Sequence, residues 1–366
     1  MTPQEERVQK ELIKKLQVKR KSKIFCYINS DRRSFPNVPG INTKLATEAQ
    51  PFIYEHLKKT GKVDKIDLLL YTRGGITDSV LPLVNLFRNY CKEFNVLVPY
   101  LAQSAGTLIC LGADNVIMGE MGELSPIDPT TVNQFNPRLI PDNPKSPQIG
   151  ISVEDVTSFI ELAKDEKVGI KEGTPEMLSV FQLLSSKVHP LALGNVYRVY
   201  LQIHSIAKKL LEMNPKKLGS SKLKQKEIIE TFVKKLYSHN YSINYKEASI
   251  ILGKKFLLKA KKPEEKLMGD LLESYVDELE IRKAFNLSSY MEDMEDEEEK
   301  HLEFIGAYLE SESLTHCFKT KLKITQRQDF PPNMHIQIQP GQDIPSVPGY
   351  PKSFNIEMLY QNWEEV

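Results

Sequence analysis

The sequence has 366 residues, which is more than one average domain requires and fewer than three would take. Hydrophobic residues make up 40% and charged residues 27%, so an ordinary globular core can form. The formal net charge is +1, which removes any argument from overall charge for binding nucleic acid or an anionic membrane.

No stretch approaches the ~20 unbroken apolar residues of a membrane-spanning helix, so we expect no integral membrane segment. Residues 1–22 have a charged, amphipathic pattern that predicts an N-terminal helix and lacks the apolar centre of a secretory signal. Cys26, Cys91, Cys110 and Cys317 show no paired spacing. These features predict a reduced, cytoplasmic protein without a zinc site.

The first half of the chain alternates between short apolar runs and amphipathic stretches. We predict strands at 23–29, 66–71, 95–99 and 114–118, and helices at 45–60, 77–92 and 104–112. Short strands that alternate with helices indicate parallel β-α-β units. The central strands are apolar on both faces, which predicts a sheet that is covered on both sides.

The second half is mostly helical by pattern. Residues 128–150 are rich in Pro and Asn and predict a long loop, which in a compact domain is usually functional or mobile. Helices are expected at 152–165, 175–186, 191–213, 224–237 and 244–252, and strands at 316–324 and 335–339. The acidic run at 291–300 marks a boundary between these two groups.

The predicted strand at 66–71 is followed by the sequence TRGGITDS. Gly74 and Gly75 leave backbone N–H groups uncovered by side chains, close to the start of a helix. Such amides form a hollow that binds anions, although a pair of glycines is also typical of a tight strand-to-helix turn. A Walker lysine and the GxGxxG spacing are both absent, so the pattern does not favour a nucleotide site.

The next strand ends just before Ser104, which opens an apolar helix. Successive parallel strands bring their carboxyl ends to one edge of a sheet, so Ser104 and the two glycines are expected to lie close together. A serine at this place is either a helix N-cap or a nucleophile on a strand-turn-helix. The pattern by itself leaves both interpretations open.

The segments TRGG, AQSAGTLICLGADNVIMG and GELSPIDP resemble the Clp protease/crotonase superfamily. Within it the sequence is most similar to the serine dehydrogenase proteinase family, which is related to signal peptide peptidase A. The resemblance covers roughly residues 5–255 and implies an α/β Clp protease/crotonase-like fold of repeated units with a helical second half. Together with the acidic run as a boundary, this predicts an N-terminal helix (1–22), a peptidase domain (23–285), an acidic linker (286–300) and a small C-terminal α+β extension of unknown role (301–366).

The resemblance implies an ATP-independent serine peptidase with Ser104 as nucleophile. The expected oxyanion donors are the N–H of Gly74 or Gly75 and that of Ala105. An extended peptide substrate would lie between the glycine loop and residues 123–127 by strand addition. The residues expected to contact that substrate are Gly106, Leu124, Ser125 and Ile127.

The general base is the open question of this site. A Clp-type triad takes its histidine from the strand after the serine helix, where this sequence reads SPIDP. Relatives of signal peptide peptidase A use a lysine instead, and the candidates by position are Lys145, Lys164 and Lys187. None of the three lies in a convincing motif, and a lysine base also needs desolvation.

Two histidines are further candidates. His239 precedes a segment that resembles the Clp-type stretch returning to the active site, although Asn240 replaces the aspartate common there. His189, at the start of a long helix, is expected to be a cap or a packing residue. We therefore favour Ser104, His239 and Asp128 as the catalytic set.

The expected partners are a peptide or protein substrate and further copies of the same chain, because Clp-like domains form oligomers through projecting helices. Dimer contacts through the N-terminal helix are the alternative. No cofactor, metal or nucleic acid is expected. Two other functions stay open: crotonase-type chemistry on an acyl-thioester, and a scaffold or regulatory protein with a degenerate site. The substrate and the biological pathway are not indicated by the sequence.

Overall fold

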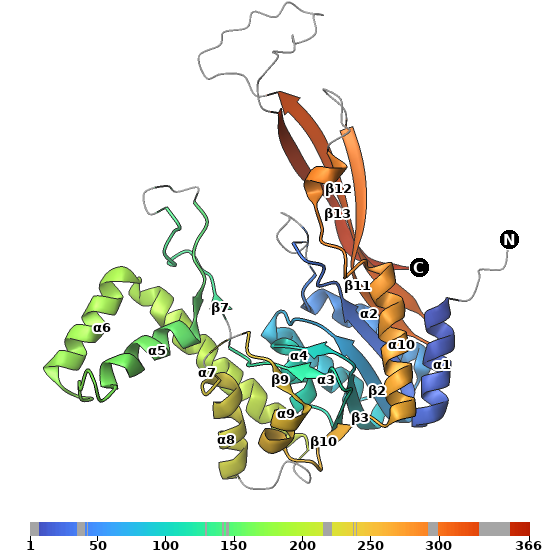
Figure 1. The fold of residues 1–366 in the computed structure, drawn as a ribbon, viewed down its shortest axis with the longest axis horizontal. Coiled ribbons are helices and arrows are strands. Elements are labelled where there is room, and N and C mark those ends of the chain that lie inside the picture. The colour runs from blue at the N-terminus through green and yellow to red at the C-terminus, as the bar shows by residue number, and fades with distance from the viewer. Residues whose placement is uncertain are drawn as a thin grey trace, which may run out of the picture.

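A computed structural model gives the fold (Figure 1). It describes residues 7–34, 41, 43–128, 130–140, 143, 146–214, 222–236, 238, 240–291, 299–328 and 352–366. An eight-stranded sheet runs through these residues in the order β10-β5-β3-β2-β1-β11-β12-β13. From β10 to β1 the neighbouring strands are parallel, and from β1 to β13 they are antiparallel.

The parallel half of the sheet confirms the predicted alternation of strands and helices. Its strands are β1 (Lys23–Asn29), β2 (Val63–Tyr71), β3 (Cys91–Val98), β5 (Asn115–Met118) and β10 (Leu257–Lys259). The connecting helices are α2 (Gln50–Thr60), α3 (Val80–Arg88) and α4 (Ala105–Leu111), with short 3-10 turns at Thr47–Ala49 and Thr77–Ser79.

The two faces of the sheet pack against different helices. Alternate residues of β1 point to opposite faces, so Phe25 and Tyr27 enter the larger core while Cys26 and Ile28 enter the other. The larger core contains α2, α3 and α4 together with parts of α7 (Pro190–Glu212), α8 (Lys222–Val233) and α9 (Tyr245–Leu252). The opposite face is covered by α1 (Val8–Arg20) and α10 (Lys262–Glu278), which lie side by side in Figure 1.

Two small sheets lie beside the main one. The first joins β4 (Leu101–Ala102), β6 (Glu123–Leu124) and β9 (Ile243–Asn244), and the second joins β7 (Thr130–Thr131) and β8 (Ile151–Ser152). Helices α8 (Lys222–Val233) and α9 (Tyr245–Leu252) flank β9 in the sequence. The predicted loop at 128–150 therefore begins with a short strand that forms part of a hairpin.

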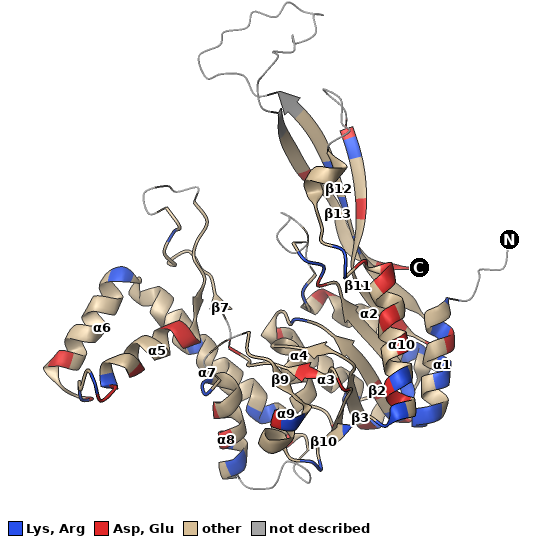
Figure 2. Cartoon of the chain, in the orientation of Figure 1, with Lys and Arg blue, Asp and Glu red and all other residues tan. Residues whose placement is uncertain are grey.

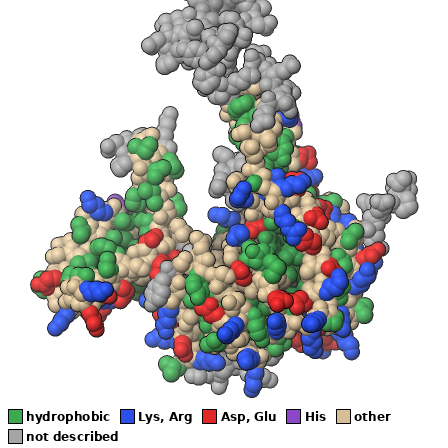
Figure 3. Space-filling view, in the orientation of Figure 1, with side chains coloured by type: hydrophobic (Ala, Val, Ile, Leu, Met, Phe, Trp, Pro, Cys, Tyr) green, Lys and Arg blue, Asp and Glu red, His purple; other side chains and the backbone are tan. Residues whose placement is uncertain are grey.

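Helices α5 (Val153–Lys164), α6 (Pro175–Lys187) and the start of α7 (Pro190–Glu212) form an arm that projects away from the sheet (Figure 1). Ser152 begins α5 with a capping box, and Thr174 caps α6. Large apolar side chains remain exposed on this arm, including Leu178, Phe181 and Tyr197. Figure 3 shows hydrophobic side chains on the arm.

The C-terminal strands continue the main sheet. Strands β11 (Glu299–Ser311), β12 (Thr315–Gln328) and β13 (Lys352–Glu365) follow a 3-10 turn at Leu287–Tyr290, and β11 pairs directly with β1. The expected strand at 316–324 is thus part of β12, whereas the one at 335–339 lies outside the described residues. The segment expected as a small extension adds strands to the sheet of the preceding domain.

Charges of both signs are interspersed over α1 and α10, as Figure 2 shows. Arg7, just before α1, forms an ion pair with Glu278 at 2.8 Å. None of the helices in the described ranges is both long and apolar enough to cross a bilayer. All four cysteines are free thiols.

Candidate active site

The loop after β2 is fixed by backbone hydrogen bonds to the segment around Leu45. The N–H of Leu45 donates to the carbonyl of Gly74 over 3.0 Å, and the N–H of Ile76 donates to the carbonyl of Leu45 over 2.8 Å. Gly74 has a φ of +111°, which residues with a side chain rarely adopt. A Cβ on Gly75 would lie 2.0 Å from the carbonyl oxygen of Leu45. Both positions therefore require glycine.

Ser104 connects β4 to α4 in a strained backbone conformation, with φ 51° and ψ −111°. Strain of this kind persists only where the surrounding structure enforces it, and it clusters at functional sites. The Ser104 side chain makes no capping hydrogen bond to α4, so the geometry does not support the N-cap interpretation. The residue is half-buried, and Ala105 after it is fully buried.

The glycine loop and Ser104 meet at the carboxyl edge of the sheet, as expected for neighbouring strand ends. A Cβ built on Gly74 would lie 2.7 Å from Cβ and 3.1 Å from Oγ of Ser104. The two segments are joined where the N–H of Thr72 donates to the carbonyl of Leu101 over 2.9 Å. A cleft of about 810 Å³ opens here and is lined by both glycines, Ser104 and Asp128.

The N–H groups around Ser104 differ in their availability. The Gly74 N–H donates to Oγ1 of Thr72 over 3.0 Å and is thereby occupied. The N–H groups of Gly75 and Ala105 have no acceptor within the described part of the chain. Ala105 is the first residue of α4, and the first N–H groups of a helix have no acceptor within the helix. Gly75 is thus a better-placed donor than Gly74.

Asp128 lies in the same cleft and is almost fully buried, with 3% of its surface exposed. Burial raises the pKa of this carboxyl from 3.8 to about 6. Its Oδ1 accepts the N–H of Glu154, in the first turn of α5, over 3.3 Å. That contact stabilises the ionised form without cancelling the effect of burial. Asp128 can therefore change its charge close to neutral pH.

None of the three lysine candidates for the base is found in the lining of the cleft within the described residues. Lys164 forms an ion pair with Glu161 at 2.9 Å and lies outside the cleft lining. Lys187 is exposed at the end of α6 and also lies outside the lining. Lys145 falls outside the described residues. Lys44, which the sequence analysis did not consider, is exposed and does line the cleft.

The two histidine candidates also differ. Nδ1 of His189 accepts the N–H of Leu191 over 3.2 Å, and its ring stacks on Phe135 with centroids 4.8 Å apart. This confirms the expected capping role of His189. His239 lies outside the described residues. The described segments on either side of it contact residues 123–127: the Ile127 N–H donates to the carbonyl of Phe232 over 3.0 Å, and β9 pairs with β6.

The residues expected to contact substrate are buried and do not line the cleft. Leu124, Ser125 and Ile127 are at most 1% exposed, Gly106 is buried, and none of them lines the cleft. A Cβ on Gly106 would lie 2.7 Å from Cγ2 of Thr72, so this glycine lets α4 pack closely on the sheet. Strand β6 is paired with β4 on one edge and β9 on the other. Strand addition at residues 123–124 was therefore a wrong expectation, because no edge is free there.

The sequence analysis missed three other walls of the cleft. Asn29, Ser30 and Asp31, at the carboxyl end of β1, contribute one wall, and Thr130, Thr131 and Val132 contribute another. Helix α7 contributes a third, whose amide side chains belong to Asn195 and Gln202. The first wall could have been predicted, because parallel neighbouring strands such as β1 and β2 end at the same edge of the sheet. The α7 contacts had no sequence signal, because its apolar stripe is typical of core packing.

Residues 1–158 match the model of a family described as ClpP-like SDH-type serine proteinase. The predicted family is confirmed over these residues. A mixed sheet with a parallel half and helices on both faces fits the α/β fold of ClpP-like proteins, while the repeated units expected within it are not tested by this match.

Two uncharacterized proteins of Methanocaldococcus jannaschii are also similar to parts of the chain. MJ0137 is 34% identical over 85 residues, which cover 23% of this chain and 30% of that protein. MJ1495 is 26% identical over 118 residues, which cover 32% of this chain and 40% of that protein. The matched segments thus span less than half of either relative, and neither name states an activity.

Proposed function

We propose that this chain is a serine peptidase in which Ser104 attacks the carbonyl carbon of a peptide bond. The observation that carries the proposal is the strained backbone of Ser104, next to a glycine loop and at the wall of a cleft of about 810 Å³. Clefts of this size are typical of substrate sites. The family match over residues 1–158, whose description names a serine proteinase, supports the same reaction class.

The oxyanion of the tetrahedral intermediate is proposed to accept hydrogen bonds from the N–H groups of Gly75 and Ala105. Both groups lack an acceptor in the described structure, whereas the Gly74 N–H is bonded to Thr72. Removing one donor of this kind typically costs about 3–4 kcal/mol of transition-state stabilisation. The positive end of α4 adds to the stabilisation of developing negative charge.

The proposed base is His239, with Asp128 as the carboxylate that orients it. His239 takes the proton of the Ser104 hydroxyl as Oγ bonds to the carbonyl carbon, and then gives that proton to the leaving amine. Water, deprotonated by the same histidine, releases the acyl group and restores Ser104. Support comes from the contacts that residues 232 and 243 make with residues 127 and 124, in the segment that leads from β6 to Asp128.

The peptide substrate is proposed to lie between residues 75–77 and β7. Both segments line the cleft: residues 75–77 follow β2 of the main sheet, and β7 belongs to the two-stranded sheet. Strand β7 pairs with β8 on one side, and its other edge has no strand partner among the described residues. An open strand edge binds an extended peptide through main-chain hydrogen bonds, which tolerate many side chains. This placement replaces the one expected at residues 123–127.

The proposal is tested by peptide hydrolysis with three proteins. The wild type should release an amine from a peptide library, Ser104→Ala should not, and His239→Ala should lower kcat by about 10²–10⁴-fold. Wild-type values in Ser104→Ala would reject Ser104 as the nucleophile. Calorimetry with coenzyme A separates the thioester alternative, since tight binding of coenzyme A by a chain that does not cleave peptides would favour it.

The scaffold alternative has one specific observation in its favour, because no histidine of the described residues lines the cleft. A degenerate site would keep the fold and bind peptides without cleaving them. Peptide binding by the wild type, with no release of amine at any pH between 5 and 9, would favour the scaffold over the peptidase.

A further inference from the structure

Ser125 was expected to contact the substrate, but in the structure it is hydrogen-bonded to the backbone of Ser104 instead. It follows β6 directly and is 1% exposed. Its hydroxyl oxygen accepts the backbone N–H of Ser104 over 2.8 Å and lies 3.0 Å from the carbonyl oxygen of Pro126. A serine hydroxyl has one proton, so donation to Pro126 leaves a lone pair for the Ser104 N–H.

A second bond ties the same residue to the helix that Ser104 opens. The N–H of Ser125 donates to Oγ1 of Thr107 over 3.0 Å. Oγ1 of Thr107 lies 2.9 Å from the carbonyl oxygen of Ala102, at the end of β4. The segment after β6 therefore contacts the Ser104 turn at its N–H and at the first turn of α4. Every group in this set is buried except Ser104 itself.

The strain at Ser104 gives these bonds their importance. A backbone at φ 51° and ψ −111° is strained for a residue with a side chain and must be held by its neighbours. The hydrogen bond from the Ser104 N–H to Ser125 fixes the peptide group that precedes Ser104. Rotation of that peptide group would bring φ of Ser104 back to an unstrained value. The same turn sets the direction of the Ser104 hydroxyl and of the Ala105 N–H.

We propose that Ser125 is a positioning residue, which holds the backbone of Ser104 in the conformation that presents its hydroxyl to the cleft. The proposal rests on the proposed peptidase function for its consequence in catalysis. Ser125 is not a catalytic residue here, because it touches neither the substrate path nor the reacting atoms. Its hydroxyl keeps its proton throughout the reaction.

The test compares Ser125→Ala with Ser125→Thr, which keeps the hydroxyl. Small misplacements of a nucleophile cost up to about 100-fold in rate, so Ser125→Ala should lower kcat by about 10- to 100-fold with KM changed less than about threefold. Ser125→Thr should recover most of kcat. Ser249→Ala is the matched control, since it removes a buried hydroxyl that bonds to Lys246 of its own helix, and it should leave both constants unchanged.

Hydrogen exchange of residues 101–108, followed by mass spectrometry, tests the same proposal without any activity. Ser125→Ala should speed exchange in this segment by about tenfold or more, whereas Ser249→Ala should not. If the wild type hydrolyses no peptide and the exchange result holds, the peptidase proposal fails and the positioning role stands. Wild-type exchange and wild-type kcat in Ser125→Ala would overturn the positioning role, as would equal losses in Ser125→Ala and Ser249→Ala.

Discussion

At the scale of single residues, the site depends on two glycines that have different reasons to be glycine. Gly74 needs its positive φ, and Gly75 needs the space beside the carbonyl of Leu45. The sequence predicted that both would expose backbone amides but left open which one faces the substrate. That choice required the hydrogen bond from Gly74 to Thr72, which depends on the path of the loop and has no sequence signal.

Gly75→Ala tests the close approach. Its Cβ would lie 2.0 Å from the Leu45 oxygen, so the loop must shift. We expect a loss of about 1–3 kcal/mol in the free energy of unfolding, together with loss of peptide hydrolysis. Gly269→Ala, in α10, is the control, because nothing lies within 4 Å of its Cβ position. Urea unfolding of both variants measures the difference, and equal stability in the two would count against a fixed loop.

Asp128 makes stability depend on pH in a defined direction. Its pKa is raised to about 6 from 3.8, so the folded state holds this proton more tightly than the unfolded chain. Stability from this group is therefore full below about pH 4 and is lost as the pH rises through about 6. The difference between a pKa of 3.8 in the unfolded chain and about 6 in the folded protein corresponds to about 3 kcal/mol.

Asp128→Asn should remove that dependence, because an amide resembles the protonated acid. At pH 8 the variant should be more stable than the wild type by up to about 3 kcal/mol, and the advantage should vanish near pH 4. Urea unfolding at pH 4, 6 and 8 measures it. A variant that is less stable than the wild type at pH 8 would show that Asp128 is stabilised as a carboxylate.

At the scale of elements, the sequence predicted local pattern well and long-range pairing poorly. The strand at 23–29 was predicted with its observed bounds, because an apolar run between polar residues marks it directly. The helix expected from residue 45 begins at Gln50, because Leu45 is engaged by the glycine loop. Strand β11 was missed, since its partner β1 lies far away in the sequence and its first residues belong to an acidic run.

The attachment of β11 can be tested through Glu310. This carboxylate is fully buried and accepts hydrogen bonds from Tyr275 at 2.6 Å and Thr315 at 2.9 Å, with Arg7 and Lys10 each 3.4 Å away. Glu310→Ala leaves the buried hydroxyls of Tyr275 and Thr315 without this acceptor and removes one carboxylate beside the half-buried Arg7 and Lys10. We therefore expect a loss of about 1–3 kcal/mol in unfolding free energy.

The control for that change is Glu303→Ala on the same strand. The Glu303 side chain is 53% exposed and pairs with Lys321, so its loss should cost less than about 1 kcal/mol. Urea unfolding compares the two variants. Similar small losses in both would mean that the buried network does not hold β11 and α1 to the sheet.

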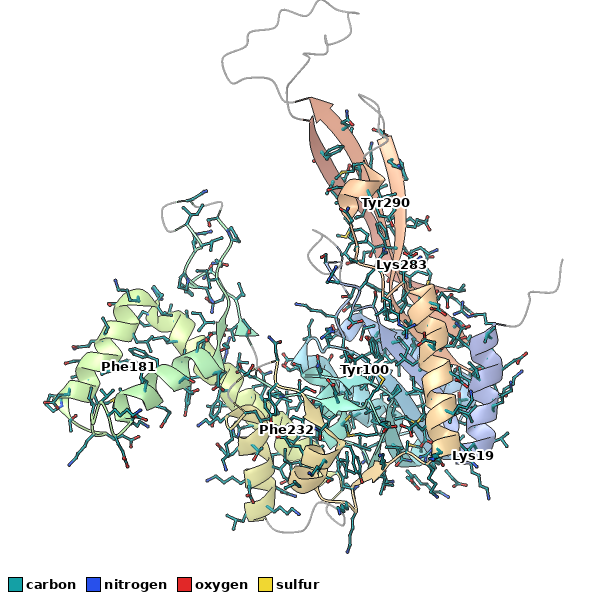
Figure 4. All side chains as sticks on the ribbon, viewed as in Figure 1. Lys19, Tyr100, Phe181, Phe232, Lys283 and Tyr290 are labelled. Carbon is teal, nitrogen blue, oxygen red and sulfur yellow. The ribbon has the colours of Figure 1, made fainter. Side chains whose placement is uncertain are left out.

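At the scale of the whole molecule, the projecting arm exposes an apolar surface that is suited to binding a second copy of the chain. Phe181 (labelled in Figure 4) lines an apolar groove of about 1000 Å³ between α5, α6 and α7, and 52% of its surface is exposed. Contiguous apolar surface of this kind is uncommon on monomers. The homo-oligomer expected from the sequence is therefore proposed to form through this arm.

Phe181→Glu tests that proposal. A charge in the groove should lower the mass measured by light scattering after size exclusion, with unchanged circular dichroism. Val18→Glu is the matched control, because Val18 is 80% exposed on α1, away from the arm. A wild type that is monomeric at all concentrations, or an oligomer that survives Phe181→Glu, would contradict the proposed role of the arm.

The central claim is that Ser104 is a nucleophile whose hydroxyl faces a cleft, beside the N–H groups that would bind the oxyanion. The most direct measurement is labelling with a fluorophosphonate probe, with the modified residue located by peptide mass spectrometry. The wild type should carry one probe on Ser104, and Ser104→Ala should carry none. No label on the wild type, or the same label on both proteins, would contradict the claim.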